Sequence, residues 1–585
     1  MKGKDISKPT ISEATSRNWK RLHSNGSGRL MSRANKQLST KTIIPIEYFS
    51  NKDNIADIQR FVASCKEQNY KVEDVVFSVG VRLLKEAGIL EKEHVAAVLN
   101  SQRSLRALRT PRAQSSLLFL SLPPLPSDEF DLLGLLYQCF LLEGEKNRKG
   151  SYFTPFEVAR NMTKGLDFSK GQTFFDPCCG SGAFLLSLDG VSPEQVFGCD
   201  NDPIAVMIAK INLLLKFPDE EFEPQIYCCD YLNDSYSSNR TYNYIISNPP
   251  WGAVILDKSG NPISTKESFS FFFEKAFNQL EDGGIIRFLL PESILNVKCH
   301  RNFRKFLLEN TDIQSITKYS GTFSGVQTKY IDVECKRTRH ALSPQDFVIE
   351  CNISNMSSGD NARIIPEMMK INKSCFYLTN NLNFNLLSDS DLQKVQKILA
   401  KKKYTLKDSV WALGVVTGDN KNKVKSKRGR GMEPIYTGKE IEAYTLKRPC
   451  KFIKYERYDF QQVAKDEIYR ADEKLVYKFI SKNLVFAYDN SKSLFLNSAN
   501  ILIPRIPGMS IKTVLAFLNS ELFKFLYKSL FGEIKILKGN LMELPFPEIT
   551  PEMDKKLANL VDEVLQGNKD ANKEIDEVIN GLLFY

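Results

Sequence analysis

Residues 174–186 read Phe-Phe-Asp-Pro-Cys-Cys-Gly-Ser-Gly-Ala-Phe-Leu-Leu, and this segment is the strongest indication of the fold class. Its apolar start predicts a buried strand, and its apolar end predicts a helix. Between them, Gly180 and Gly182 allow a tight turn in which the backbone approaches a ligand closely. This order is typical of the first unit of an open α/β sheet that binds a nucleotide. The segment is neither a G-x-G-x-x-G fingerprint nor a P-loop, because no phosphate-binding lysine follows it.

Three further short apolar runs follow, and each leads into a polar residue: Asp200, Asp230 and Asn248. Because the carboxyl ends of strands in an open α/β sheet meet at one edge, these residues and Asp176 are expected to line one crevice. Asp200 lies about 20 residues past the glycines, the spacing typical of an acid that holds ribose hydroxyls. A single aspartate is more often a turn residue or helix cap, so the prediction depends on the repetition. The three predicted strands are 195–199, 225–229 and 242–247.

The third of these strands ends in Asn248-Pro-Pro-Trp251. Each proline has a fixed φ and no backbone N–H, so the turn is stiff and its carbonyls can point into a pocket. The Asn248 side-chain oxygen and a proline carbonyl can both accept from an exocyclic amino group. The indole of Trp251 can stack on a planar ring, a contact that contributes roughly 1–3 kcal/mol per base. The segment therefore predicts a site for a planar group with an amino nitrogen, and the alternative is a chance turn.

Together these motifs resemble those of the S-adenosylmethionine-dependent DNA methyltransferases that modify the N6 of adenine. The order matches their gamma group: a Phe-Thr-Pro segment, the glycine motif, Asn-Pro-Pro-aromatic, then a recognition region. Gly150-Ser-Tyr-Phe-Thr-Pro155 is similar to the opening motif, and Leu133-Gly-Leu-Leu-Tyr137 on the preceding predicted helix (128–145) also looks like the family. The resemblance covers roughly residues 128–345. It is strongest to type I modification subunits and type IIG enzymes of restriction–modification systems.

The resemblance implies an α/β fold: a Rossmann-like methyltransferase domain, an N-terminal helical region and a C-terminal α+β target-recognition domain. It also implies S-adenosylmethionine as the cofactor. The family's cofactor-binding residues fall on Tyr152 and Thr154 at the methionine end, Asp176, Gly180 and Gly182 in the turn, Asp200 at the ribose, and Asp230 at the adenine amino group.

The same resemblance implies that Asn248, Pro249, Pro250 and Trp251 form the catalytic segment, with Trp251 stacking on a flipped-out target adenine. Phe323 is in the position of the family's second stacking aromatic, and a core phenylalanine is the alternative interpretation. Tyrosine or phenylalanine is commoner than tryptophan at the position of Trp251. The adjacent Cys178 and Cys179 are unusual in the glycine turn, and we interpret both as packing residues.

The chemistry that these residues predict is a direct methyl transfer. N6 of adenine is a poor nucleophile because its lone pair is delocalised into the ring, and two acceptors around it would free that lone pair. Catalysis would then consist of positioning and electrostatic stabilisation, without a covalent intermediate or a histidine base. The target must leave the duplex for the transfer geometry to form. Methylation of cytosine C5 needs a cysteine nucleophile, and the Pro-Cys pairs at 177–178 and 449–450 lack the right context.

Composition limits the class of protein. The 585 residues are 42% hydrophobic, enough for several cores, with no uninterrupted apolar run of about 18 residues. The N-terminus has no apolar segment typical of a signal peptide. Twelve cysteines are scattered without a C-x2-C pair, which argues against a disulfide framework and a zinc site. We therefore expect a cytoplasmic protein with no metal and no membrane association.

Positive charge is concentrated in two places. Residues 1–42 hold ten Lys or Arg against two acids, which accounts for +8 of the net charge of +11. Within this arm, residues 11–22 have the pattern of a helix-turn-helix recognition helix. Residues 421–430 hold six Lys or Arg. Such asymmetry suggests a polyanionic partner, here double-stranded DNA, and solvated surface segments are the alternative. The predicted DNA contacts are Arg17, Lys20, Arg21, Lys425, Lys427, Arg428 and Arg430.

The remaining expectations concern domains and competing functions. Short segments between 380 and 550, such as 414–420 and 536–547, resemble target-recognition domains in their order. The predicted domains are a basic arm (1–42), a helical region and linker (43–127), the methyltransferase domain (128–345), the recognition domain (380–550) and a C-terminal helix (551–585). Alternative functions are RNA methylation, glutamine methylation, or DNA binding without catalysis. A separate endonuclease or specificity subunit would be a partner.

Overall fold

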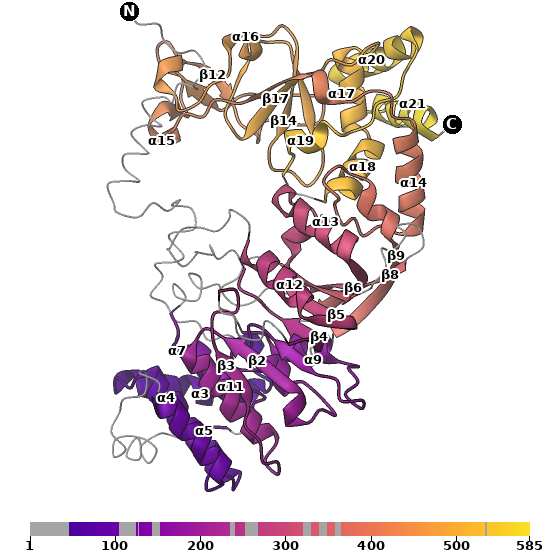
Figure 1. The fold of residues 1–585 in the computed structure, drawn as a ribbon. Coiled ribbons are helices and arrows are strands. Elements are labelled where there is room, and N and C mark those ends of the chain that lie inside the picture. The colour runs from indigo at the N-terminus through magenta and orange to yellow at the C-terminus, as the bar shows by residue number, and fades with distance from the viewer. Residues whose placement is uncertain are drawn as a thin grey trace, which may run out of the picture. The chain divides into compact units, whose positions relative to one another are not determined.

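The computed structural model describes residues 46–104, 124–126, 128–142, 153–233, 240–251, 267–319, 329–337, 348–356, 364–532 and 535–584. Within them the chain forms two compact units, one ending at Lys373 and one beginning at Ser374 (Figure 1). Five predicted site residues lie outside the described residues: Arg17, Lys20, Arg21, Tyr152 and Phe323.

The first unit is built on a nine-stranded sheet of order β3-β2-β1-β4-β5-β7-β6-β8-β9 (Figure 1). Strands β3, β2, β1, β4 and β5 run parallel to one another, whereas β7 runs antiparallel to both β5 and β6. All three residues of β1 are fully buried, as expected for a parallel strand covered on both faces. The strands are β1 Phe174–Asp176, β2 Val196–Asp200, β3 Gln225–Cys228, β4 Tyr242–Ser247, β5 Leu280–Pro291, β6 Thr311–Tyr319, β7 Tyr330–Arg337, β8 Val348–Met356 and β9 Ile364–Asn372.

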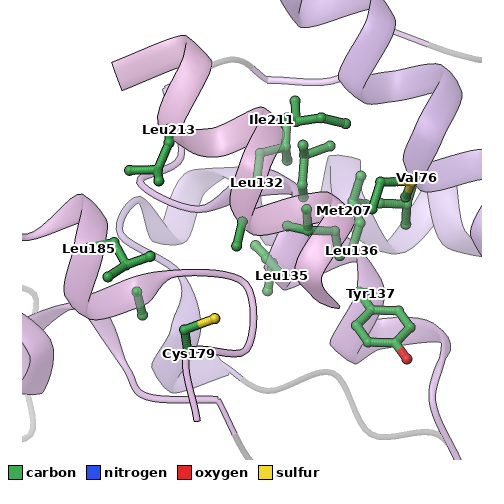
Figure 2. Packing of buried hydrophobic residues seen from close by; sticks show 14 of the residues in the cluster. Val76, Leu132, Leu135, Leu136, Tyr137, Cys179, Leu185, Met207, Ile211 and Leu213 are labelled. Atoms are coloured by element: carbon green, nitrogen blue, oxygen red, sulfur yellow. The ribbon is translucent and has the colours of Figure 1, made fainter. Parts of the chain in front are cut away.

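Three helices of this unit, α4, α7 and α11, pack together around one apolar core (Figure 2). Val76 on α4, Leu136 on α7 and Ile211 on α11 are all fully buried. A Cβ at Gly80 would lie 2.8 Å from Ile211 Cδ1, so glycine lets α4 approach α11 closely. The helices are α3 Ile55–Glu67, α4 Val72–Glu86, α5 Glu93–Ser104, α7 Leu132–Phe140, α9 Phe156–Thr163, α10 Ala183–Leu186, α11 Pro203–Lys216, α12 Ser268–Asn278 and α13 Arg301–Asn310.

The second unit contains two four-stranded sheets, of orders β10-β17-β14-β15 and β11-β13-β12-β16, and a helical cluster. Its strands are β10 Val410–Leu413, β11 Val424–Lys425, β12 Glu433–Tyr436, β13 Lys451–Ile453, β14 Lys474–Lys478, β15 Phe486–Asp489, β16 Leu494–Phe495 and β17 Ala499–Ile503. Its helices are α14 Asp389–Ala400, α15 Asn420–Lys423, α16 Asp466–Tyr469, α17 Ile511–Asn519, α18 Glu521–Phe531, α19 Lys538–Leu541, α20 Pro551–Leu565 and α21 Ala571–Phe584.

Two boundaries differ from the sequence prediction. The single C-terminal helix predicted at 551–585 is wrong, because the chain forms α20 and α21 with Gly567 between them at φ 103°. L side chains rarely adopt this conformation, so the first helix ends there. The methyltransferase domain was predicted to end near 345, yet β8 and β9 extend the same sheet to Asn372. The predicted α/β fold class is confirmed. Among the described residues, no helix is long and apolar enough to cross a membrane.

Candidate active site

The ends of β3, β2, β1 and β4 form one edge of the first sheet. These four strands are consecutive neighbours and parallel, so their carboxyl ends lie side by side. Asp200 ends β2 and Asp176 ends β1, whereas Asp230 and Asn248 follow β3 and β4 within two residues. The structure therefore brings the four residues that the sequence singled out to one edge, in the order Asp230, Asp200, Asp176, Asn248.

The glycine turn after β1 is held against the end of β2. Gly180 and Gly182 have φ angles of 53° and 93°, in the left-handed region that only glycine adopts readily. The backbone N–H of Gly180 donates to Asp200 Oδ2 (2.9 Å). A Cβ at Gly180 would lie 3.0 Å from the ring of Phe153, which precedes Thr154 in the Phe-Thr-Pro segment. Both glycines are thus required by backbone geometry, and the turn is placed by an acid of the neighbouring strand.

Asp176 is fully buried below this turn. Its Oδ1 accepts from the backbone N–H of Cys178 (3.0 Å) and from the Ser247 hydroxyl (2.7 Å). Its Oδ2 is buried and has no hydrogen-bond partner among the described residues. Burial, reinforced by the nearby charge of Asp200, raises the pKa of Asp176 to about 7. A buried acceptor of this kind costs free energy unless a donor reaches it, which fits the approach of a polar ligand.

Asp200 and Asp230 differ in environment. Asp200 is half-buried and accepts from the backbone N–H groups of Gly180 and Asp202, and burial raises its pKa to about 6. Asp230 is exposed and caps the turn that follows β3, accepting from the backbone N–H of Leu232 (3.1 Å) and from Asn233 Nδ2 (2.8 Å). Asp230 therefore stabilises this turn, and a ligand that bound to its carboxylate would share that carboxylate with these two donors.

Helix α7 holds the turns after β1 and β2 in place, which the sequence motifs did not predict. Asp131 caps α7 by accepting from the Gly134 N–H (2.9 Å), and it also accepts from the Ser181 hydroxyl of the glycine turn. The hydroxyl of Tyr137, farther along the same helix, donates to Oδ2 of Asp202 (2.7 Å), a residue that follows β2. The similarity of Leu133–Tyr137 to the family was the only sequence signal of these contacts.

We expect Gly134→Ala to destabilise the first unit. An added Cβ would lie 2.1 Å from Asp131 Oδ2 and 2.6 Å from Ser181 Cβ. Alanine favours a helix over glycine by up to about 1 kcal/mol. The overlap outweighs that gain, because overpacking typically costs about 1–3 kcal/mol and the glycine turn must shift. Urea unfolding monitored by circular dichroism measures the difference.

The matched control is Gly581→Ala on α21, where an added Cβ has no atom within 4 Å. This substitution is expected to be neutral or slightly stabilising. Equal unfolding midpoints for the two variants would contradict the close approach of α7 to the glycine turn.

The Asn248–Trp251 segment contacts the Phe-Thr-Pro segment and the sheet. Asn248 Nδ2 donates to the hydroxyl of Thr154 (3.2 Å), which is only 7% exposed. A side-chain amide that donates through Nδ2 presents Oδ1 as its acceptor. The carbonyl of Pro250 accepts from the Ser268 hydroxyl at the start of α12. The Pro250 carbonyl is thus engaged within the protein. The Pro249 carbonyl is therefore the better candidate for the acceptor that acts beside Asn248 Oδ1.

Trp251 is fixed by both its nitrogen and its ring. Its indole N–H donates to the Leu289 carbonyl on β5 (3.1 Å). Its ring centroid lies 6.4 Å from that of Tyr330, which in turn stacks on Tyr319 at 4.9 Å. The half-buried indole is therefore backed by two buried tyrosines. The sequence identified Trp251 but gave no sign of the tyrosines behind it.

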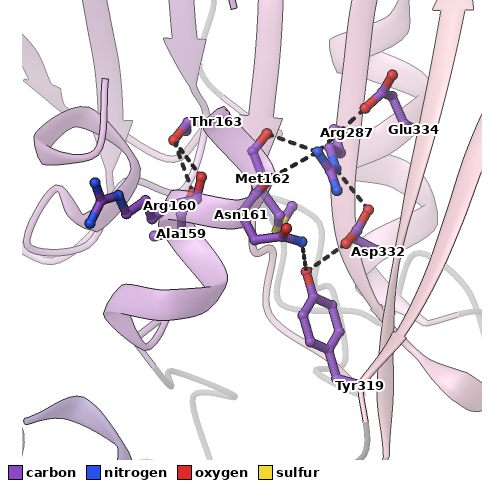
Figure 3. A network of polar contacts seen from close by, with 9 residues as sticks. All are labelled: Ala159, Arg160, Asn161, Met162, Thr163, Arg287, Tyr319, Asp332 and Glu334. Atoms are coloured by element: carbon purple, nitrogen blue, oxygen red, sulfur yellow. Dashed lines mark hydrogen bonds and ion pairs between the residues drawn. The ribbon is translucent and has the colours of Figure 1, made fainter. Parts of the chain in front are cut away.

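A buried polar network continues from Tyr319 (Figure 3). The Tyr319 hydroxyl donates to Asp332 Oδ2 (2.7 Å) and accepts from Asn161 Nδ2 (3.0 Å). Arg287 donates to Asp332 Oδ1 (2.7 Å) and to the backbone carbonyls of Asn161 and Met162 near the end of α9 (both 3.2 Å). The network ties α9, which follows Thr154, to strands β5, β6 and β7. It therefore supports both segments that meet at the Asn248–Thr154 hydrogen bond.

The predicted basic contacts of the second unit are at the sheet of order β11-β13-β12-β16. Lys425 ends the edge strand β11, and Lys427, Arg428 and Arg430 are in the loop that follows. All four residues are exposed. The structure therefore groups these cations on one segment.

Comparisons with known proteins agree with this architecture. Residues 128–330 match the N-6 DNA Methylase family, and residues 433–546 match the TaqI-like C-terminal specificity domain. The chain is 29% identical over 360 residues to Type II methyltransferase M.VspI of Vibrio sp. (strain 343), covering 58% of this chain and 83% of that protein. It is 34% identical over 131 residues to the Type I restriction enzyme MjaVII methylase subunit of Methanocaldococcus jannaschii, covering 21% of this chain and 22% of that subunit.

Among solved structures, the fold is similar to that of the type IIL restriction-modification enzyme MmeI in complex with DNA. The TM-score is 0.57 at 12% sequence identity, over 92% of this chain and 96% of that one. The resemblance inferred from the sequence motifs is confirmed. The two family matches lie on the two structural units and together span just over half of the residues. The chain therefore belongs to the DNA methyltransferases of restriction–modification type, with an N-6 DNA methylase domain and a TaqI-like specificity domain.

Proposed function

We propose that this protein transfers a methyl group from S-adenosylmethionine to the N6 of an adenine that is flipped out of a specific DNA sequence. The observation that carries the proposal is the convergence of Asp176, Asp200 and Asn248 at one sheet edge, with Thr154 hydrogen-bonded to Asn248. In this proposal the first unit performs catalysis, and residues 380–550 recognise the target in double-stranded DNA.

The residues at the sheet edge fit the proposed cofactor. Gly180 and Gly182 carry no side chains, so the backbone of their turn can approach a ligand closely, and Asp176 Oδ2 is a buried acceptor without a hydrogen-bond donor among the described residues. Asp200 would accept from the ribose hydroxyls, and Asp230 from the adenine amino group. When bound, S-adenosylmethionine supplies an electrophilic methyl group on a sulfonium. Thr154 would lie near its methionine end.

The remaining chemistry belongs to the Asn248–Trp251 segment. Asn248 Oδ1 and the Pro249 carbonyl would accept from the two N6 hydrogens of the target adenine, which directs the nitrogen lone pair toward the methyl group. The Thr154 hydroxyl fixes the plane of the Asn248 amide in advance, so little reorganisation is needed during transfer. The Trp251 ring, backed by Tyr330, would stack on the adenine.

The test is to incubate the protein with labelled S-adenosylmethionine and mixed-sequence duplex DNA, then map N6-methyladenine by sequencing. Methylation at one recurrent motif is expected. Transfer to RNA instead of DNA would overturn the proposal. Bound cofactor without transfer to either nucleic acid would indicate that a partner, such as a separate specificity subunit, is required.

Cofactor affinity should depend on pH through Asp200. Because its pKa is raised to about 6, the carboxylate that would accept from the ribose is largely protonated at pH 5. The affinity for S-adenosylhomocysteine is therefore expected to rise between pH 5 and pH 7, by up to about tenfold per pH unit. Titration calorimetry measures this rise, and Asp200→Asn should reduce it. A pH-independent affinity in the unaltered protein would argue against Asp200 as the ribose acceptor.

Folding stability should change in the opposite direction. The folded-state pKa values of Asp176 and Asp200 lie above the ordinary value of 3.8. Their contribution to stability is fully present below about pH 3.8 and is lost as the pH rises through about 6 to 7. Asp176→Asn should therefore weaken the loss of stability between about pH 4 and pH 7 in the absence of cofactor.

A further inference from the structure

The Phe-Thr-Pro segment and helix α9 form one continuous piece of chain that is connected to both ends of the Asn248–Trp251 segment. Thr154 lies two residues before α9, and its hydroxyl accepts from the amide of Asn248 at the first end. The second end is Trp251, which is connected to α9 through two buried tyrosines. The residues proposed to hold the cofactor's methionine end and those proposed to hold the target base therefore share one support.

The connection from Trp251 to α9 consists of two ring contacts and one hydrogen bond. The ring centroids of Trp251 and Tyr330 are 6.4 Å apart, and those of Tyr330 and Tyr319 are 4.9 Å apart. Both separations are typical of packed aromatic pairs. The Tyr319 hydroxyl then accepts from Asn161 Nδ2 on α9 at 3.0 Å (Figure 3). Both tyrosines are only 2% exposed, so these contacts form a continuous path inside the first unit.

The Tyr319 hydroxyl is held firmly at the α9 end of this path. Besides accepting from Asn161, it donates to Asp332 Oδ2 at 2.7 Å. Burial, reinforced by the charge of Asp332, raises the pKa of Tyr319, so the hydroxyl keeps the proton that it donates. Arg287 bonds the other oxygen of Asp332 and the backbone carbonyls of Asn161 and Met162. A displacement of α9 must therefore move the Tyr319 ring or break buried hydrogen bonds, which costs free energy.

We propose that Tyr319 is a positioning residue that couples occupancy of the cofactor site to the orientation of the Trp251 ring. This inference rests on the proposed function and adds a second connection between the two sites, besides the hydrogen bond from Asn248 to Thr154. A cofactor bound beside Thr154 would bias the position of α9, and the Tyr319 hydroxyl would pass that bias through Tyr330 to Trp251. Coupling between two binding sites is reciprocal, so a base stacked on Trp251 would equally favour the bound cofactor.

The test follows the fluorescence of Trp251 in the full-length protein. The chain contains three tryptophans, so Trp251 is the only one left after Trp19→Phe and Trp411→Phe. Acrylamide quenching of Trp251 is measured with and without saturating S-adenosylhomocysteine, and calorimetry measures the binding itself. The ligand is expected to change the quenching constant. Tyr319→Phe keeps the ring and removes the hydroxyl, so it should lose most of this response, while its affinity for S-adenosylhomocysteine changes by less than about fivefold.

A second variant removes the other partner of the same hydrogen bond. Asn161→Ala deletes the donor to Tyr319 and keeps the Asn161 carbonyl that Arg287 contacts. It should lose the Trp251 response as Tyr319→Phe does. The two substitutions together should lose no more than either alone, because groups that act through one contact are not additive. Asn161→Ala also leaves the bond from Tyr319 to Asp332 in place, so it tests the inference even if Tyr319→Phe fails to fold.

The matched control is Tyr244→Phe. Tyr244 is on β4, the strand that leads into the Asn248–Trp251 segment, and its hydroxyl donates instead to the Asp167 carbonyl (3.0 Å). Its Trp251 response should equal that of the parent protein.

The inference alone is overturned if S-adenosylhomocysteine binds and Trp251 responds equally in Tyr319→Phe and Tyr244→Phe. The same holds if bound ligand leaves Trp251 unchanged in the parent protein, or if Asn161→Ala retains the full response. Failure of S-adenosylhomocysteine to bind the parent protein would overturn the proposed function, and this inference with it.

Discussion

Substitution of Asn248 by alanine is expected to lower the rate of methyl transfer by at least about 100-fold and to leave cofactor affinity nearly unchanged. Loss of one preorganised hydrogen-bonding group at a reacting centre typically costs a factor of about 100 to 1000 in kcat. Asn248 lies beyond the end of β4, whereas the glycine turn and Asp200 belong to β1 and β2. Single-turnover transfer to duplex DNA and calorimetric binding of S-adenosylhomocysteine measure the two effects separately.

Asn310→Ala provides the matched control for this experiment. Asn310 is an exposed asparagine of the same unit, and its amide donates to the Phe306 carbonyl at the end of α13. Transfer by this variant should be unaffected. Near-normal transfer by Asn248→Ala would refute the assignment of Asn248, and an equal loss of cofactor binding would indicate a structural role instead.

Arg287→Ala is expected to destabilise the first unit by about 3–5 kcal/mol. Arg287 and Asp332 form a buried ion pair, and removal of the arginine leaves a buried carboxylate without its cation. Burial alone would lower the pKa of Arg287. The negative charge of Asp332 outweighs this effect, so the pKa of Arg287 is raised. The substitution also removes two hydrogen bonds from Arg287 Nη1 to the backbone carbonyls of Asn161 and Met162 near the end of α9. Urea unfolding at neutral pH measures the loss.

The neighbouring Arg160 offers a control for the Arg287 variant. Arg160 is exposed, and its guanidinium lies over the Phe156 ring at 5.8 Å (Figure 3 shows it pointing away from the network). Arg160→Ala should change stability by less than about 1 kcal/mol, as surface substitutions usually do. Comparable losses for the two arginines would mean that the buried network contributes little.

The parts of the site that the sequence predicted are those encoded locally. Each strand end carries its polar residue within two positions of the strand, so the apolar pattern located Asp176, Asp200 and Asn248 directly. The contacts that hold them were not predictable in this way. Asp131 reaches Ser181 across 50 residues, and Arg287 reaches Asp332 across 45. Nothing in the spacing of such residues indicates that they meet, because the meeting depends on the order of strands in the sheet.

The two contacts that α7 makes with the sheet edge depend on the helical phase of residues 131–137, because this phase sets the relative directions of the Asp131 and Tyr137 side chains. The start of this short helix holds the turn after β1 through Asp131, and Tyr137 farther along holds Asp202, which follows β2 and caps α11. An α-helix advances about 100° per residue, so one inserted residue would rotate Tyr137 away from Asp202 while Asp131 stayed in place. A change of length in this segment would therefore disrupt the alignment of the two contacts even if every contacting side chain were retained. The spacing from Asp131 to Tyr137 therefore fixes the position of the loop after β1 relative to the loop after β2.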